Sequence, residues 1–188
     1  MTTTYKVSVL VGSLRKGSYN RKLAEAMIKM APPTLSLEIV EIGELPFYNE
    51  DIDNETPPAS YTSFREKIRA SDAILIVSPE YNRSVPAVLK NALDVGSRPY
   101  GKSVWNEKPT AVITASTGTI GGFGANHHIR QSLVFLNMPC MQQPETYLGG
   151  IADAFDEAGN LNERTHNFVK NIVEAYDKWV RRLLDLSL

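Results

Sequence analysis

The segment Gly12–Asn20, which follows an apolar run, carries residue types that bind a phosphate group. It reads Gly-Ser-Leu-Arg-Lys-Gly-Ser-Tyr-Asn, so it offers hydroxyl and amide donors together with the charge of Arg15. A helix that begins there would add aligned N–H groups and a partial positive charge. The segment lacks the G-x-G-x-x-G dinucleotide pattern, and Ser18 and Tyr19 occupy the positions where a P-loop needs Lys and Ser or Thr. We therefore favour a site for one phosphate group, with helix capping by Ser18 or Asn20 as the alternative.

Two further polar loops follow apolar runs. Ser78–Pro86 reads Ser-Pro-Glu-Tyr-Asn-Arg-Ser-Val-Pro, in which Asn82 offers donors and an acceptor and Tyr81 could cover the face of a flat ring. Ala115–Gly124 has four glycines in its last seven residues, which would let backbone approach a flat ligand closely. Taken alone, each loop is equally compatible with an ordinary connection.

Short apolar runs alternate with amphipathic segments along the whole chain. Strands are expected at 6–11, 35–42, 73–77 and 110–115, with a short fifth strand at 138–141. Helices are expected at 20–30, around Tyr61, Phe64 and Ile68, and at 86–95, 126–136 and 165–184. This alternation predicts one α/β domain over residues 1–188, with a doubly wound five-stranded parallel sheet and helices on both faces. The three polar loops would then meet at the carboxyl edge of the sheet, where such folds bind ligands.

Composition excludes several classes of protein. The chain has 188 residues and a formal net charge of −1, which excludes a strongly basic nucleic-acid binder. Its single cysteine, Cys140, excludes an intramolecular disulfide and a cysteine-rich metal cluster. No run approaches the roughly 18 apolar residues that span a bilayer, and no secretory signal is visible. We expect a cytoplasmic protein with no membrane partner.

Several conspicuous residues are expected to have no catalytic or metal-binding role. His127 and His128 are adjacent, so on a helix they would point about 100° apart, as surface or interface residues rather than metal ligands. Cys140 is expected to be inert core. The segment 41–55 holds six acidic residues and no Lys or Arg, which indicates a solvated rim loop. The nucleophile-elbow pattern G-x-S-x-G does not occur.

Taken together, these motifs resemble the NAD(P)H-dependent FMN reductase family, whose fold is flavodoxin-like. The resemblance runs from about residue 6 to residue 150 and is carried by Gly12–Asn20, Leu45–Asn49, Ser78–Asn82, Ser84–Pro86 with Leu89–Asp94, and Gly121-Gly122. It is strongest to the bacterial quinone and chromate reductase branch, with azo-dye reductases as near relatives. It implies the strand order 2-1-3-4-5.

The resemblance also implies bound FMN and assigns residues to it. Its phosphate would be held by Ser13, Arg15, Ser18 and Asn20, in a loop lined by Leu14, Lys16, Gly17 and Tyr19. Pro79, Glu80, Tyr81 and Asn82 would border the isoalloxazine, mostly through backbone groups, and Ser116, Thr117 and Gly118 would touch its other edge. Ala115 departs from the pattern, because relatives often carry a hydroxyl there, so a contact from this position would use the backbone.

The function implied is that of an enzyme. NAD(P)H would deliver hydride to FMN, and the electrons would pass to quinones, with azo compounds or chromate-like oxyanions as further acceptors. The resemblance implies no obligatory catalytic side chain and no metal, and a homodimer or homotetramer that pairs through helices 87–95 and 126–136. Two alternatives remain: a flavodoxin-type electron carrier, although such carriers are usually strongly acidic, and a flavin redox sensor without NAD(P)H turnover.

Overall fold

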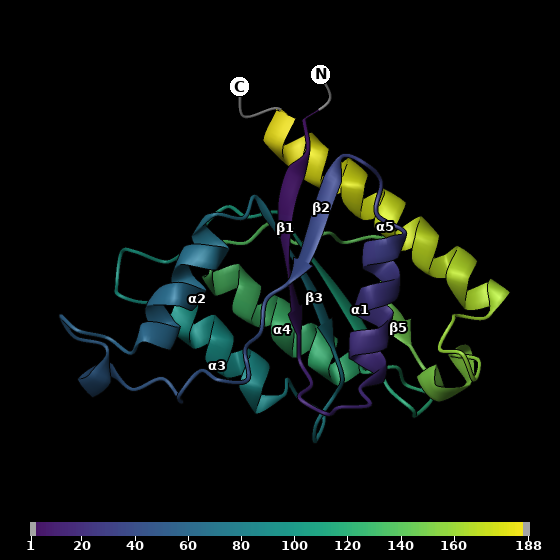
Figure 1. The fold of residues 1–188 in the computed structure, drawn as a ribbon, viewed down its shortest axis with the longest axis horizontal. Helices are drawn as coiled ribbons and strands as arrows, with labels where there is room; N and C mark the ends of the chain where they lie inside the picture. The colour runs from purple at the N-terminus through teal and green to yellow at the C-terminus, as the bar shows by residue number, and fades with distance from the viewer. Residues whose placement is uncertain (1–2, 186–188) are drawn as a thin grey trace.

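The structure, a computed structural model, describes residues 3–185, and its centre is a five-stranded parallel sheet. The strands are β1 (Tyr5–Val11), β2 (Leu35–Ile39), β3 (Ala73–Ser78), β4 (Thr110–Ala115) and β5 (Tyr147–Leu148). Their order is β2-β1-β3-β4-β5, and every neighbouring pair is parallel (Figure 1). The expected flavodoxin-like order is therefore confirmed.

Helices cover both faces of this sheet. They are α1 (Tyr19–Lys29), α2 (Ala59–Arg69), α3 (Ala87–Gly96), α4 (Phe123–Phe135) and α5 (Glu163–Leu184), with two 3₁₀ turns, η1 (Glu50–Ile52) and η2 (Ile151–Ala154). The side chains of α1 and α5 pack in one hydrophobic cluster, and those of α2, α3 and α4 pack in a second cluster on the opposite face. No helix within residues 3–185 is both long and apolar enough to cross a bilayer.

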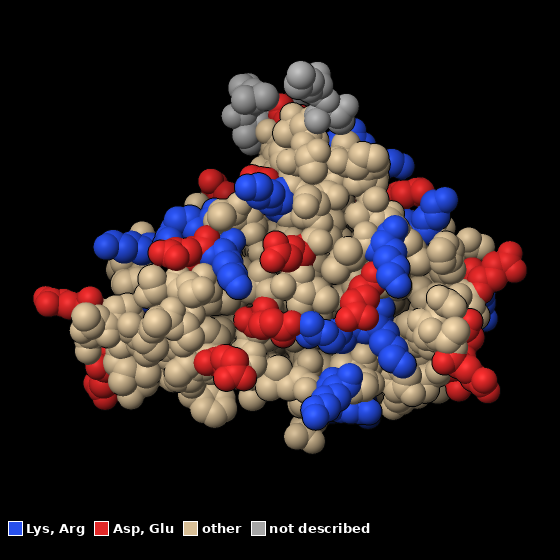
Figure 2. All heavy atoms as spheres, viewed as in Figure 1, with Lys and Arg blue, Asp and Glu red and all other residues tan. Residues whose placement is uncertain are grey.

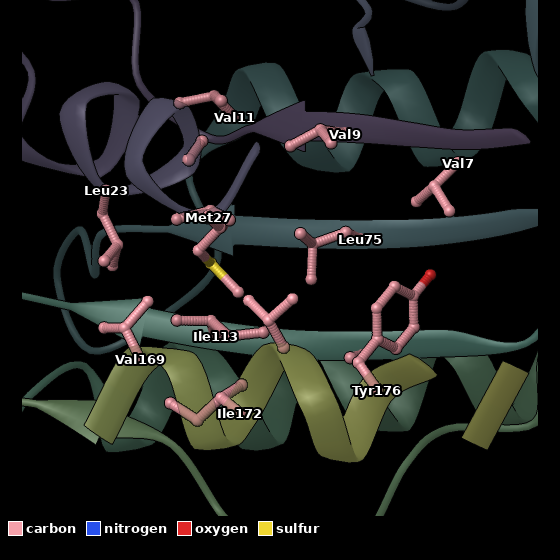
Figure 3. Close-up of a cluster of buried hydrophobic side chains, with 14 of the residues drawn as sticks. Val7, Val9, Val11, Leu23, Met27, Leu75, Ile113, Val169, Ile172 and Tyr176 are labelled. Carbon is pink, nitrogen blue, oxygen red and sulfur yellow. The ribbon is translucent and has the colours of Figure 1, made fainter. Parts of the chain in front are cut away.

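Strand β3 lies at the centre of both clusters, as its unbroken apolar run predicts. Its residues alternate between the faces: Leu75 packs with α1 and α5, whereas Ile74 and Ile76 pack with α2, α3 and α4. Figure 3 shows the first cluster, in which side chains of β1 and β3 meet Leu23 and Met27 of α1 and the face of α5 that carries Tyr176. Each such side chain contributes about 1.5–3 kcal/mol when fully buried, so these two layers hold the sheet rigid.

The predicted fifth strand at 138–141 is wrong. That segment makes only one parallel bridge, between Cys140 and Thr110, and the true β5 lies at Tyr147–Leu148. Side chains replace the ladder between these two points: Arg130 Nη1 donates to the Met141 carbonyl at 3.0 Å, and Asn126 Nδ2 donates to the Val112 carbonyl at 3.3 Å. With these backbone acceptors occupied, 142–145 leaves the sheet before pairing resumes at the Thr146 carbonyl, which accepts from the Thr114 amide.

The prediction of a solvated acidic loop at 41–55 is wrong for Asp53. Its carboxylate receives two hydrogen bonds from the Arg65 guanidinium of α2, at 2.8 and 2.6 Å, and Arg65 Nε donates to the Val95 carbonyl at 2.9 Å. The two side chains are only 2% and 6% exposed. The segment contains no cation of its own, so a pattern confined to it could not reveal this partner.

We predict that Asn126→Ala lowers the free energy of unfolding by roughly 2–3 kcal/mol, because it leaves buried carbonyl groups without a donor. Asn126 is fully buried and also accepts a hydrogen bond from Arg130 Nε at 2.7 Å. Urea unfolding would measure the change. Asn171→Ala, the same substitution on the exposed face of α5, is the control and should stay within about 0.5 kcal/mol. Equal effects of the two substitutions would contradict the role given to Asn126.

Candidate functional site

The loop between β1 and α1 starts in close contact with β3. The Gly12 amide donates to the Val77 carbonyl at 2.9 Å. A Cβ atom at Gly12 would lie 2.3 Å from Ser78 Oγ, so no larger residue fits there without a shift. The β1–α1 loop is thereby fixed beside the start of the β3–α3 loop.

An arc of free N–H groups follows this contact. The amides of 13–17 donate to no acceptor within the described residues 3–185. Ser18 closes the arc: its amide donates to the Arg15 carbonyl at 3.1 Å, and its Oγ accepts from the Arg21 amide at 3.3 Å as the N-cap of α1. Ser18 therefore caps the helix, as the alternative hypothesis held, while the amides before it stay available. Free amides at a helix N-terminus form an anion site.

Asn20 connects this loop to the end of β4. Its Nδ2 donates to the Ala115 carbonyl at 3.1 Å, and this contact fixes which way the amide points. Its Oδ1 is buried and lacks a hydrogen-bond partner in the structure. A buried amide oxygen without a donor is costly, so this atom calls for a ligand that carries an N–H or O–H group.

The β3–α3 loop, residues 79–86, contains a tight hairpin with two residues at its tip. The Tyr81 amide donates to the Ser84 carbonyl at 3.0 Å, and the Ser84 amide donates to the Tyr81 carbonyl at 2.9 Å. Asn82 and Arg83, at the tip, have φ values of 50° and 64°, the left-handed geometry of a type I′ turn. For a residue such as arginine this geometry costs about 1–2 kcal/mol. The amides of these two tip residues donate to nothing else within 3–185, so they are fixed but unused.

The side chain of Glu80 joins this hairpin to α4. Its Oε2 accepts from the Ala125 amide at 3.0 Å, in the first turn of α4, and its Oε1 lies 3.6 Å from Arg83 Nη1. A Cβ at Gly124 would lie 2.6 Å from the Arg83 carbonyl oxygen, so α4 and the hairpin are in contact. Because the Glu80 carboxylate is used in this contact, only the backbone of Glu80 is available to a ligand.

The β4–α4 loop is fixed by the segment 147–150. The Ser116 amide donates to the Leu148 carbonyl at 3.0 Å, and Ser116 Oγ donates to the Gly118 carbonyl at 3.1 Å. A Cβ at Gly121 would lie 2.5 Å from the Tyr147 carbonyl carbon. A glycine is therefore needed at 121 because two backbone segments pack closely there. The sequence had instead suggested that it lets backbone approach a ligand. Thr117 and Gly118 remain exposed.

Sequence reasoning missed the side chains that hold the β2–α2 loop. Asn91 of α3 is buried; its Oδ1 accepts from the Tyr48 amide at 2.8 Å and its Nδ2 donates to the Pro46 carbonyl at 2.9 Å. The Tyr61 hydroxyl donates to the Phe47 carbonyl at 3.0 Å. Asn91 is one residue of the segment 89–94 quoted for the resemblance, but no local pattern indicates that it reaches 45–48.

The two histidines diverge, as expected. His128 Nδ1 lies 2.8 Å from Ser84 Oγ, whereas His127 packs against Phe123 and its Nε2 lies 3.2 Å from the Tyr147 hydroxyl. No group of three or more His, Cys, Asp or Glu side chains within residues 3–185 is arranged to hold a metal ion. Cys140 is partly buried, and this burial raises the pKa of its thiol, which fits a structural side chain.

The structure brings the three predicted loops into one site. The contact of Gly12 with Ser78 joins the first loop to the second, Glu80 joins the second to the third, and Asn20 joins the first to the end of β4. The site offers an anion cradle, a buried acceptor and the fixed amides of Asn82 and Arg83. These features suit a ligand with a phosphate, hydroxyl groups and a flat polar-edged ring.

The chain is similar in sequence to known proteins over nearly its whole length. Residues 5–153 match the model of the family described as NADPH-dependent FMN reductase. A quinone reductase from Pseudomonas putida is 61% identical over 181 residues, with 96% of this chain and 97% of that protein covered. A 2-hydroxy-1,4-benzoquinone reductase from a Burkholderia species is 44% identical over 177 residues, which cover 94% of this chain and 96% of that protein.

Solved structures show the same relationship. FerB, a flavoenzyme NAD(P)H:(acceptor) oxidoreductase from Paracoccus denitrificans, superimposes with a TM-score of 0.89 at 38% identity, covering 96% of this chain and 99% of that one. An azoreductase from Bacillus anthracis matches with a TM-score of 0.62 at 16% identity over 95% of this chain and 100% of that one, a likeness of fold alone. The sequence match and the fold together place this chain in the NADPH-dependent FMN reductase family.

Proposed function

We propose that this protein is an FMN-containing enzyme that oxidises NAD(P)H and reduces quinones. The observation that carries the proposal is the 61% identity, over nearly the full length of both chains, to a protein named quinone reductase. The relative named for 2-hydroxy-1,4-benzoquinone supports the same class of acceptor. The azoreductase match rests on 16% identity and lends no support to azo compounds, and nothing observed favours chromate.

The residues of the site fit FMN part by part. The free amides of 13–17, the N-terminus of α1 and the Arg15 guanidinium suit its phosphate. The fixed amides of Asn82 and Arg83, with exposed Thr117 and Gly118 opposite, suit the polar edges of its ring. The residues proposed to hold it are Ser13, Leu14, Arg15, Lys16, Gly17, Ser18, Tyr19, Asn20, Pro79, Glu80, Tyr81, Asn82, Ser116, Thr117 and Gly118.

For Asn20 the structure favours a more specific role than phosphate binding. Its Nδ2 is used by the Ala115 carbonyl, so the group left over is Oδ1, an acceptor. A phosphate dianion has no proton to donate, whereas a ribityl chain carries hydroxyl groups. We therefore assign Asn20 to a hydroxyl of the ribityl chain.

When bound, FMN supplies a ring that accepts a hydride from reduced nicotinamide and afterwards gives up two electrons to an acceptor. The protein chain positions the flavin ring and places polar groups beside it. The hairpin 81–84 holds its tip amides in place at the cost of two left-handed residues, so they need no rearrangement when negative charge develops beside them. Glu80 fixes that hairpin against α4. The protons that a reduced quinone takes up would come from solvent, so we assign no side chain of the site as acid or base.

We further propose that two copies pair through the groove between α3 and α4. A cavity of about 660 Å³ lies there, lined by residues of both helices and of 97–106. Phe135 and Tyr100, on its rim, are each 90% exposed. Exposed aromatic groups around a groove mark a protein interface. A dimer of such dimers would give the tetramer. The single cysteine and the NAD(P)H donor also favour a cytoplasmic location.

The first prediction from the proposed function is that the purified protein shows a flavin spectrum that NADPH bleaches under anaerobic conditions and that a benzoquinone restores. Stopped-flow absorption would follow both steps. A flavin that NADPH and NADH both fail to bleach would instead support an electron carrier or a redox sensor. Protein that takes up no FMN would contradict the cofactor.

The second prediction separates the phosphate from the ribityl chain. Arg15→Ala should weaken FMN binding by about 1–3 kcal/mol, the range of a hydrogen bond to a charged group, and should leave riboflavin, which has no phosphate, unaffected. Asn20→Ala should weaken both flavins by a similar factor. Fluorescence titration of the apoprotein would measure the affinity of the unaltered protein and of each variant for both flavins. Arg69→Ala, at the exposed end of α2, is the control. Loss of riboflavin affinity in Arg15→Ala would overturn the assignment.

The third prediction concerns assembly. Phe135→Lys should place a charge in the α3–α4 groove and halve the molar mass measured by light scattering after size-exclusion chromatography. Phe47→Lys, at a second exposed phenylalanine outside the groove, should leave the mass unchanged. If the mass of Phe135→Lys matches that of the unaltered protein, the groove is not the interface.

A further inference from the structure

A second cavity lies on the other side of the β1–α1 loop. It has a volume of about 290 Å³ and lies between that loop and the chain that leaves β2. Its floor is apolar and buried, formed by Val11, Val40 and Ile42. Leu14 leans over the end of β2, since a Cβ at Gly43 would lie 2.9 Å from its Cδ2. The volume is at the lower end of the range for ligand pockets, so it can hold one portion of a larger ligand.

The rim of this cavity is basic. Arg15, Lys16 and Arg21 surround it together with a single carboxylate, Glu41. Figure 2 shows this face of the molecule, where basic side chains gather at the lower edge, around the β1–α1 loop. An apolar floor with cations at its rim is suited to a flat base that carries a phosphate.

The carboxylate is already neutralised by Arg21. The guanidinium of Arg21 donates to both oxygens of Glu41, at 3.2 and 2.5 Å, and the pKa of Glu41 is lowered by this partner. Neither Arg15 nor Lys16 makes an ion pair within residues 3–185. At least one of these cations is therefore free for a ligand, even when Arg15 is engaged by the phosphate of FMN.

The cavity shares the β1–α1 loop with the cradle proposed for FMN but lies on the other side of that loop. The sheet order places β2 on one side of β1 and β3 with β4 on the other. Asn20 reaches the Ala115 carbonyl of β4, so the cradle opens toward β3 and β4, whereas the cavity opens toward residues 39–42. In doubly wound folds that bind dinucleotides, a residue at the carboxyl end of the second strand contacts the adenosine ribose, and a nearby arginine accommodates a 2′-phosphate. Glu41 lies two residues beyond the carboxyl end of β2, and Arg21 of α1 pairs with it.

We infer that this cavity binds the adenosine end of the dinucleotide donor, with Lys16 on the 2′-phosphate and Arg21 holding Glu41 neutral beside it, so that the enzyme favours NADPH over NADH. The inference rests on the proposed function for its donor. Discrimination between NADPH and NADH would then occur on the β2 side of the β1–α1 loop. The nicotinamide would reach the flavin-ring site on the β3 side of the same loop.

The test uses the FMN-loaded protein and two adenosine probes that lack nicotinamide, adenosine 2′,5′-bisphosphate and 5′-AMP, titrated by calorimetry. The unaltered protein should bind the bisphosphate roughly tenfold more tightly, the effect of one added charge-assisted hydrogen bond. Lys16→Ala should bring this ratio close to one. Glu41→Gln, which frees Arg21 and removes a negative charge, should raise the ratio severalfold. Lys6→Ala, the same change of charge at the amino end of β1, is the control and should leave the ratio unchanged.

Equal affinities for the two probes in the unaltered protein would overturn the inference, as would a ratio that neither Lys16→Ala nor Glu41→Gln changes. Glu41 lies outside the residues proposed to hold FMN. The Glu41→Gln variant therefore still tests the inference if the Lys16→Ala variant no longer binds FMN. Failure of the proposed function looks different, because then neither NADPH nor NADH would bleach the flavin, whatever the adenosine probes show.

Discussion

The parallel pairing of β1 with β3 is the constraint on which the rest of the site depends. The two strands lie side by side in register from Val7 with Ala73 to Val11 with Val77. The helices that follow them, α1 and α3, leave toward opposite faces of the sheet. Where such connections diverge, a crevice opens at the carboxyl edge that no side chain of the core fills. Gly12, which has no room for a Cβ against Ser78, lets the two loops start in contact.

Polar side chains then fix what the crevice presents. Asn20, Glu80 and Asn126 each connect a helix or hairpin to a neighbouring loop or strand through a hydrogen bond. The bonds of Asn20 and Asn126 are buried and that of Glu80 is partly buried, so breaking one would leave an unpaired group, which costs about 1–3 kcal/mol when buried. They therefore hold the loops in one arrangement before any ligand binds. The strained hairpin tip persists for the same reason: the surrounding contacts determine it.

The β1–α1 loop has two sides, and each suits a different anion. On the β3 side, its amides and the start of α1 form the cradle assigned to FMN. On the β2 side, its cations border the cavity assigned to the adenosine end of the donor. One short loop thus lies beside both the resident cofactor and the donor. Arg21 keeps Glu41 from repelling a phosphate there, since paired charges present little net field.

The sequence by itself determined what depends on neighbours close along the chain. Apolar periodicity located β1 to β4 and the five helices, the turn residues located the three loops, and the residue types of 12–20 indicated a phosphate. The tertiary structure alone decided what depends on distant partners. Asn126 and Arg130 occupy the Val112 and Met141 carbonyls, through which the pairing at Cys140 would have continued, and β5 forms at 147–148 instead. Arg65 reaches back to bury Asp53, and the Ala115 carbonyl orients Asn20 across 95 positions of the chain. A hydrogen bond or an ion pair needs both partners at one distance, and only the folded chain sets that distance.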